Sequence, residues 1–166
     1  RGLGDVYKRQ GLGNRALLME QLERDLALAR RHHWAVALLF LDLDGFKRVN
    51  DHYGHAVGDR VLKLMARRLQ AVLRETDLLC RLGGDEFIVL VPHAGSDEEL
   101  QQVALKLIRS SERPLSELDI DLALSASVGI ARYPENGRSA QQLLVAADRA
   151  MYAAKARQGG CAQPAG

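Results

Sequence analysis

The chain has 166 residues, of which 47% are hydrophobic and 27% are charged, a composition typical of one globular domain with a sizeable core. Its longest apolar run, WAVALLFL at 34–41, is far too short to span a bilayer, so membrane contact by this domain is not expected. The two cysteines, Cys80 and Cys161, lack metal or redox spacing and indicate reduced thiols in a cytoplasmic protein.

The formal net charge of +2 is set by the first ten residues. Their segment DVYKRQ (5–10) is the translation of a transposon-end adapter used for sequencing libraries, so we expect residues 1–10 to be an assembly scar. Excluding their three basic residues and one acid leaves 20 basic and 20 acidic residues. The charge therefore favours neither a nucleic-acid nor a membrane partner, and we expect the natural N-terminus to lie outside this chain.

Apolar periodicity and glycine or proline punctuation predict the elements in chain order. They are a helix at 15–31, a strand at 35–43, a loop with a short helix at 46–59, a helix at about 57–73, strands at 78–82 and 87–91, a helix at 96–112, one bent strand or two strands within 118–133, and a helix at 139–156. Pro92 is expected to close the strand before it. The domain is expected to span 11–160, with 161–166 as a C-terminal tail.

The predicted fold class is α/β of the α+β kind. A hairpin at 78–91, with Gly83 and Gly84 supplying the positive φ of its turn, favours a mixed, mainly antiparallel sheet of about five strands with helices packed around it. The strand at 35–43 is apolar on both faces, which predicts a central position covered on both sides.

Acidic side chains gather at the predicted end of this central strand and on the hairpin turn. If the hairpin pairs beside that strand, Asp42, Asp85 and Glu86 converge, and converging carboxylates repel one another unless a cation neutralises them. Their hard oxygen ligands favour Mg²⁺ or Mn²⁺, with the Leu43 carbonyl as a further ligand. The alternative is a solvated hairpin tip and turn chemistry at a strand end, and spacing alone leaves the two interpretations even.

A magnesium ion with few protein ligands usually takes its remaining ligands from phosphate, so a phosphate site is expected nearby. Phe46 and Lys47 begin a segment whose free N–H groups suit phosphate oxygens, and Lys47 and Lys155 are candidate charge partners. Taken without the carboxylates, each lysine is better explained as a solvated surface residue.

The stretch RLGGDEF at 81–87 resembles the signature of the GGDEF domains, the diguanylate cyclases. Four further segments resemble other blocks of that family, in family order, so that the resemblance covers about 11–160. They are GLGNR (11–15), FLDLDGFKRVNDHYGHAVGD (40–59), SVGIARYPENG (127–137) and LLVAADRAMYAAKA (143–156). The resemblance implies a nucleotidyl-cyclase or palm-like fold with its active site at the hairpin.

The resemblance also implies a reaction. Two GTP condense to cyclic di-3′,5′-GMP with release of two pyrophosphates, at half-sites that meet across the two-fold axis of a transient homodimer. Matched positions imply Asp42, Leu43, Asp85 and Glu86 at the metal, with Asp85 and Glu86 also catalytic. They imply Phe46, Lys47 and Lys155 at the phosphates, and Asn50 and Asp59 at the guanine.

A second nucleotide site is implied by RETD at 74–77, where the family binds its product. Arg74 and Asp77 are then an inhibitory site for cyclic di-GMP, whereas the alternative is an i, i+3 ion pair at a helix end. An upstream sensor or receiver domain is expected outside this chain. The family often has an arginine one helical turn beyond the lysine at 155; this chain has Gly159 and Gly160 there, so that one phosphate contact is lost or Arg157 replaces it.

Two other functions stay open at this stage. A domain of this kind can keep the fold and sense cyclic di-GMP without making it, but such domains lose the central acids, which this chain retains. A nucleotidyl cyclase or polymerase-like palm domain uses the same two-carboxylate chemistry, and the guanine-reading positions argue against it.

Overall fold

The computed structural model describes residues 12–157, 159–160 and 162–166, in which helices and strands alternate. In chain order the elements are α2 (Arg15–His32), β1 (Ala35–Asp44), α3 (Phe46–Tyr53), α4 (His55–Val72), β2 (Leu78–Gly83), β3 (Glu86–Ala94), α5 (Asp97–Glu112), the short 3₁₀ helix η1 (Ser116–Leu118), β4 (Ser125–Tyr133), α6 (Ala140–Ala156) and β5 (Ala162–Pro164). The expectations for residues 1–10 lie outside the described residues.

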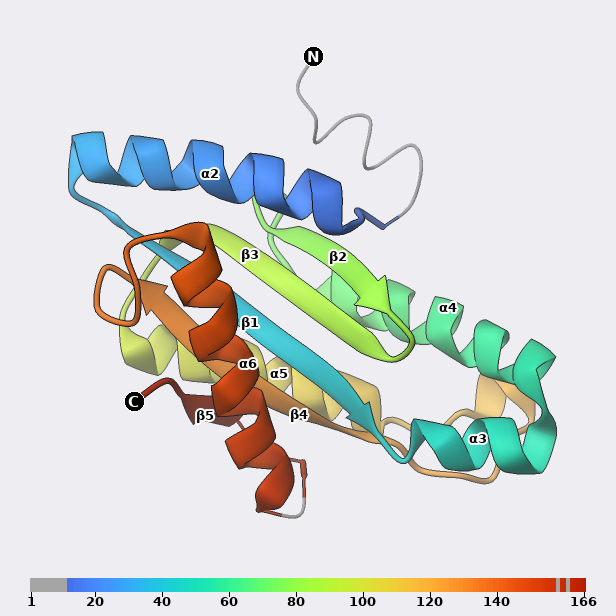
Figure 1. Cartoon of the computed structure of the whole chain (residues 1–166). Helices are drawn as coiled ribbons and strands as arrows, with labels where there is room; N and C mark the ends of the chain where they lie inside the picture. Colours follow the sequence, from blue (N-terminus) through green and yellow to red (C-terminus); the bar gives the residue numbers. More distant parts are fainter. Residues whose placement is uncertain (1–11, 158, 161) are drawn as a thin grey trace.

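The five strands form one sheet in the order β2-β3-β1-β4-β5 (Figure 1). Strand β1 pairs antiparallel with β3 on one side and with β4 on the other, β2 pairs antiparallel with β3, and β5 pairs parallel with β4. The predicted mixed, mainly antiparallel sheet is therefore confirmed, and β1 is its central strand. Every residue of β1 except Asp44 is buried, as its apolar run predicts.

Helices cover both faces of the sheet. Helices α2 and α6 lie over one face and α4 and α5 over the other, which gives three layers with the core between them (Figure 1). Asn14 caps α2 through its side-chain oxygen, which accepts a hydrogen bond from the Leu17 N–H at 2.9 Å, as the sequence predicts. In the described part of the chain, no helix combines the length and apolar character that crossing a membrane requires.

Helix α6 approaches the sheet very closely because β4 carries a glycine beneath it. A Cβ placed on Gly129 would lie 2.1 Å from the Ala147 carbonyl oxygen and 2.2 Å from the Met151 nitrogen, both backbone atoms of α6. Only glycine therefore fits at this position. The close packing brings the last turn of α6 to the end of β1, where the predicted site lies.

Two element boundaries differ from prediction. Strand β3 does not stop at Pro92 but continues to Ala94. The ladder between β1 and β3 shifts register between Ala35 and Ala37, opposite this stretch, and such an irregularity accommodates a residue that has no N–H to donate.

The sequence predicts strand structure within 118–133, but only the second part of this region is a strand, because β4 begins at Ser125. Asp119 adopts a left-handed conformation, with φ of 53°, which turns the chain after η1. The alternating apolar residues Ile120 and Leu124 are buried all the same, so their pattern reflects packing of a loop into the core.

The predicted tail contributes to the sheet. Residues 162–164 pair with β4 and provide the fifth strand, and the Ala165 N–H donates to the Ile130 carbonyl at 2.7 Å. A three-residue strand is too short to give a readable period-2 pattern.

Candidate functional site at the end of the central strand

The β2–β3 hairpin brings its acidic turn to the carboxyl end of β1. Asp42 lies opposite Glu86 in the β1–β3 ladder, and the Leu43 N–H donates to the Asp85 carbonyl oxygen at 3.2 Å. The turn is possible because Gly84 adopts a φ of 51°, in the left-handed region that glycine tolerates. The predicted convergence of the strand end and the hairpin is therefore present.

Two carboxylates interact at this junction, those of Asp42 and Asp85. Burial, the negative charge of Asp42 and a hydrogen bond with Asp42 together raise the pKa of Asp85 to about 6. Asp42 is only 7% exposed, and its Oδ1 atom is buried without a hydrogen-bond partner. A buried carboxylate oxygen without a partner is costly, so the geometry favours a bound cation at this point.

Lys155, on the last turn of α6, is the positive charge nearest to these acids. Its Nζ donates to Asp42 Oδ2 at 2.5 Å, and the Lys155 side chain is 39% exposed. Burial lowers the pKa of Lys155, but the hydrogen bond to Asp42 and the charges of Asp42, Asp44 and Asp85 outweigh it and raise that pKa overall. The ammonium therefore holds Asp42 from the side of α6.

A further acid, Asp148, is close enough to Glu86 to influence it. Burial and the negative charges of Asp42 and Asp148 raise the pKa of the Glu86 carboxyl group, and the charge of Lys155 opposes them. Asp148 stands seven residues before Lys155 on α6, a spacing that places both side chains on one helix face. The sequence analysis missed Asp148, although this spacing was a readable signal.

The residues at the junction fit a hard divalent cation that phosphate helps to hold. Within the described ranges, no three His, Cys, Asp or Glu side chains are arranged to hold an ion by themselves. Mg²⁺ is usually bound through one or two carboxylates, with water and substrate phosphates completing its shell. The Asp42–Asp85 pair, with its unpartnered oxygen, meets that requirement.

The predicted phosphate segment begins directly after β1. Gly45, with φ of 83°, turns the chain into α3, so that the N–H groups of Phe46 and Lys47 stand in the first helical turn. N–H groups in the first turn of a helix have no partner within the helix and suit an anion. Phe46 is buried and anchors the turn, whereas Lys47 is exposed.

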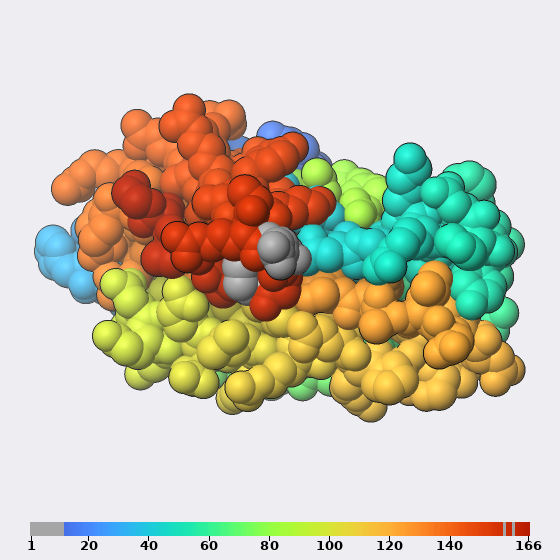
Figure 2. All heavy atoms as spheres, turned by 90° about the horizontal axis from the view of Figure 1, so that it is seen from below, coloured from blue at the N-terminus to red at the C-terminus, as the bar shows by residue number. Residues whose placement is uncertain are grey.

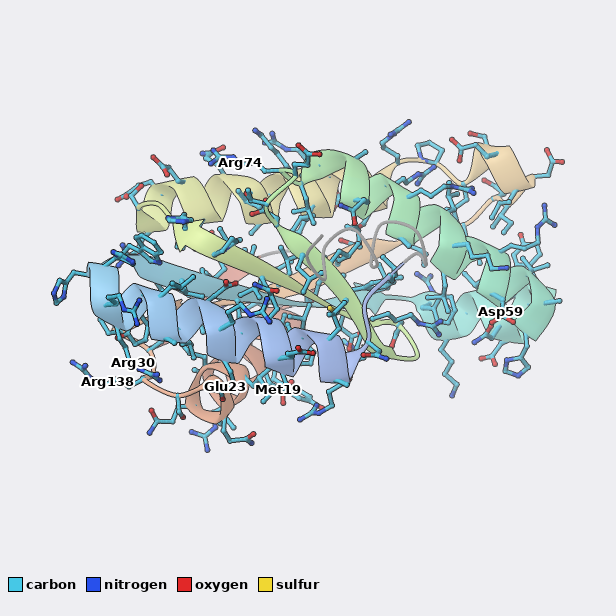
Figure 3. All side chains as sticks on the ribbon, turned by 90° about the horizontal axis from the view of Figure 1, so that it is seen from above. Met19, Glu23, Arg30, Asp59, Arg74 and Arg138 are labelled. Atoms are coloured by element: carbon cyan, nitrogen blue, oxygen red, sulfur yellow. The ribbon has the colours of Figure 1, made fainter. Side chains whose placement is uncertain are left out.

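The predicted guanine readers are neighbours at the α3–α4 corner. A Cβ on Gly58 would lie 1.9 Å from Asn50 Oδ1, so the Asn50 side chain packs directly against the backbone next to Asp59. Asp59 itself is exposed near the start of α4, where Figure 3 labels it. Close packing on glycine fixes the Asn50 amide, and the Asp59 carboxylate remains accessible.

The RETD residues lie far along α4 from this corner, as the labels of Arg74 and Asp59 in Figure 3 show. The Asp77 carboxylate is buried and accepts a hydrogen bond from the Arg74 main-chain N–H at 2.9 Å. Burial raises the pKa of Asp77, and that hydrogen bond opposes the shift. Both residues line a cavity of about 220 Å³ together with His93 and Lys106.

The structure thus divides the predicted residues into three groups. The first comprises Asp42, Leu43, Asp85, Glu86 and Lys155 at the end of β1, with Phe46 and Lys47 following in α3. The second comprises Asn50 and Asp59 at the α3–α4 corner, and the third comprises Arg74 and Asp77 beyond the end of α4.

Comparison with known proteins finds relatives along most of the chain. The family model described as diguanylate cyclase, GGDEF domain, matches residues 10–161. The chain is 43% identical over 152 residues to the bifunctional diguanylate cyclase/cyclic di-GMP phosphodiesterase MucR of Pseudomonas aeruginosa, and 43% identical over 145 residues to the diguanylate cyclase TpbB of the same species. These matches cover 90% and 87% of this chain, but only 22% of MucR and 33% of TpbB.

Solved structures show the same fold. The crystal structure of the GGDEF domain of TpbB superposes with a TM-score of 0.89 at 41% identity, and the match covers 94% of this chain and 98% of that one. The GGDEF domain of DgcB from Caulobacter crescentus, solved in complex with c-di-GMP, superposes with a TM-score of 0.83 at 26% identity over 93% of this chain and 91% of that one. The chain therefore belongs to the GGDEF family of diguanylate cyclase domains.

Proposed function

We propose that this domain is a GTP-dependent nucleotidyltransferase that condenses two GTP to cyclic di-3′,5′-GMP and two pyrophosphates. One observation carries the proposal: the carboxylates of Asp42 and Asp85, with the unpartnered Asp42 Oδ1, lie at the strand end that leads into the N-terminus of α3, and Lys155 contacts Asp42. This combination provides for a divalent cation and for a triphosphate in one place. We expect the reaction to take place in the cytoplasm.

Asp42, Asp85, Glu86 and the Leu43 carbonyl are the groups that would hold Mg²⁺ or Mn²⁺. The ion, when bound, neutralises triphosphate charge and stabilises the departing pyrophosphate. The N–H groups of Phe46 and Lys47, the Lys47 ammonium and the Lys155 ammonium bind phosphate oxygens. We also assign Asp85 the role of accepting the proton of the attacking 3′-hydroxyl, the role that its position in the family signature implies.

Asn50 and Asp59 select the base. Guanine presents two adjacent donors, N1–H and the N2 amine, which a carboxylate accepts, and adenine lacks that pair. A nucleotide that leaves the Asp59 carboxylate unpaired forfeits roughly 1–3 kcal/mol.

Each chain carries one such half-site, and the product contains two equivalent phosphodiester bonds. We therefore propose that two chains meet transiently across a two-fold axis, where the 3′-hydroxyl of one GTP attacks the α-phosphorus of the other. Cyclic di-GMP binds at Arg74 and Asp77 and inhibits. An upstream sensor or receiver domain then controls how often two chains meet.

The experiment is incubation of the purified chain with GTP and Mg²⁺, followed by separation of the nucleotides by chromatography. We expect cyclic di-GMP from the wild type, none from Asp85→Ala, and the wild-type amount from Asp121→Ala, the same substitution at an exposed aspartate in the loop before β4. Wild-type turnover by Asp85→Ala contradicts the assignment of the site.

The same domain can instead act as a module that senses cyclic di-GMP, and the cavity beside Arg74 and Asp77 is the observation that favours this role. Bound cyclic di-GMP without turnover of GTP supports sensing over synthesis. If synthesis is observed, Arg74→Ala relieves inhibition by added product, and unchanged inhibition contradicts the assigned site.

A further inference from the structure

Asp44, the last residue of β1, accepts a hydrogen bond from the segment that follows α6. Its two carboxylate oxygens lie 3.0 and 2.9 Å from the Ser127 hydroxyl, and the Gly160 N–H donates to Oδ2 at 3.1 Å. Ser127 is fully buried on the neighbouring strand β4, so it holds the Asp44 carboxylate in one orientation. The segment after α6 is thus tied to the central strand by a carboxylate that is itself fixed.

The two glycines of this segment are required for different reasons. Gly159 and Gly160 both have positive φ, 75° and 61°. A Cβ on Gly159 would lie 2.3 Å from Asp44 Oδ2, whereas a Cβ on Gly160 would lie 3.0 Å from the Ser125 hydroxyl. Of the two, only Gly159 would therefore bring an added Cβ against the Asp44 carboxylate, to which the Gly160 N–H donates a hydrogen bond.

The end of α6 is consequently held to β1 at two successive positions on one face of the sheet. Lys155 contacts Asp42, and Gly160, five residues later, contacts Asp44, two residues further along β1. Figure 2 shows the red C-terminal part of the chain lying beside the cyan segment that contains the end of β1 and the start of α3. The second attachment limits how far Lys155 can move from the phosphate side of the site.

We propose that Asp44 is a positioning residue. It holds the Gly159–Gly160 turn through a hydrogen bond and thereby fixes the position of the Lys155 ammonium relative to a bound triphosphate. The inference rests on the proposed function, since it assumes that GTP binds beside Lys155. Since its oxygens accept hydrogen bonds from Ser127 and Gly160, we assign Asp44 a role that acts through Lys155, and not the role of a metal ligand.

The first test needs no nucleotide. Hydrogen exchange measured on the whole chain reports the Gly160 amide, which we expect to exchange at least tenfold faster in Asp44→Ala than in the wild type. An unchanged rate overturns the attachment, whatever the domain catalyses. Failure of this test is therefore distinct from failure of the proposed function, which is the absence of GTP binding and turnover in the wild type.

The second test measures the affinity for α,β-methylene GTP, a non-reactive analogue, in Mg²⁺ by calorimetry. We expect at least fivefold weaker binding for Gly159→Ala and no more than twofold weaker binding for Gly166→Ala, the same substitution at a glycine where an added Cβ meets nothing within 4 Å. In a Lys155→Ala background, Gly159→Ala should have no further effect, because the turn acts through the lysine.

Three results overturn the proposal. Equal losses in Gly159→Ala and Gly166→Ala mean that the loss does not depend on contact with Asp44. A full, additive loss from Gly159→Ala in the Lys155→Ala background means that the turn does not act through the lysine. Loss of Mn²⁺ binding in Asp44→Ala without nucleotide makes Asp44 a direct ligand.

Discussion

Asp42 shows how one residue can serve two partners in succession. In the structure its Oδ2 accepts a hydrogen bond from Lys155, and its Oδ1 is buried without a partner. A divalent cation that binds the Asp42–Asp85 pair would therefore share the Asp42 carboxylate with the Lys155 ammonium, which already contacts it. The lysine competes with the cation when no nucleotide is present and cooperates with it once phosphate oxygens arrive, because both then attract the same anion.

Lys155→Ala is accordingly expected to have opposite effects on two affinities. Mn²⁺ binding without nucleotide should strengthen about three- to fivefold, as a partly exposed ion pair is worth up to about 1 kcal/mol. GTP binding should weaken about tenfold or more, since a charged hydrogen bond to phosphate contributes roughly 1.5–3 kcal/mol. Calorimetric titration measures both.

Lys47→Ala is the matched control for this experiment, because Lys47 is proposed to contact phosphate and is exposed at the start of α3. It should weaken GTP binding and leave Mn²⁺ binding without nucleotide unchanged. If Lys155→Ala binds Mn²⁺ no more tightly than the wild type, competition for Asp42 is refuted.

Asp25, on the buried face of α2, is a second acid whose environment penalises its charge. It is 6% exposed, its Oδ1 accepts from Gln21, and its Oδ2 is buried without a partner. Burial raises its pKa, while the hydrogen bond from Gln21 and the electrostatic influence of His93 oppose that shift. A raised pKa means that the native state binds the Asp25 proton more tightly than the unfolded chain does, so ionisation destabilises the fold.

Asp25→Asn should therefore raise the free energy of unfolding at pH 7.5 by about 1 kcal/mol. The gain should be absent below the ordinary aspartate pKa of 3.8, should appear as the pH rises above that value, and should be complete above the raised native pKa. Urea unfolding of both proteins at pH 3 and pH 7.5 measures it. A gain of the same size at both pH values would point to packing instead of charge.

At the scale of elements, what the sequence could predict depended on the range of the interaction. The hairpin at 78–91 was predictable because two adjacent glycines and two apolar runs are a local signal. Strand β5 was not, since three residues carry no period and their pairing with Val128–Ile130 depends on the whole of α6 between them. The role of Asp44 was equally hidden, because its partners Ser127 and Gly160 lie 83 and 116 residues away.

The contact between α6 and β4 leads to a prediction about both stability and function. Gly129→Ala places a methyl group against backbone atoms of α6, which cannot rotate away, so the helix must shift. We expect a loss of about 3 kcal/mol in the free energy of unfolding, at the upper end of overpacking. Because the helix carries Lys155, GTP affinity should fall in the protein that remains folded.

Denaturant unfolding and calorimetry measure these two effects. Ala131→Gly, on the same strand and also buried, is the control, since it removes a methyl group and leaves α6 where it is. It should lower stability with little change in GTP affinity. Gly129→Ala with wild-type stability would show that α6 does not depend on this close approach.

In the whole molecule, the proposed catalytic groups and the proposed inhibitory site belong to different parts of the fold. Asp42 and Asp85 lie where β1 meets the hairpin turn, whereas Arg74 and Asp77 lie between α4 and the start of β2 and face α5. The catalytic groups stand at one end of a rigid sheet. Product bound at Arg74 is therefore better placed to affect how two chains meet than to displace GTP directly.

In the proposed reaction a single chain supplies only one half-site, and this leads to a prediction about concentration. At low protein concentration the rate of cyclic di-GMP formation should rise with the square of the concentration, because two chains must associate before either bond can form. It should become linear once the dimer is saturated. Initial rates over about a hundredfold range of concentration, at fixed GTP and Mg²⁺, measure the change of order.

Adding Asp85→Ala to a fixed amount of wild type should lower the yield per wild-type chain, since mixed pairs contain one inactive half-site. A rate strictly proportional to concentration, unaffected by the added variant, would mean that one chain completes both bonds alone.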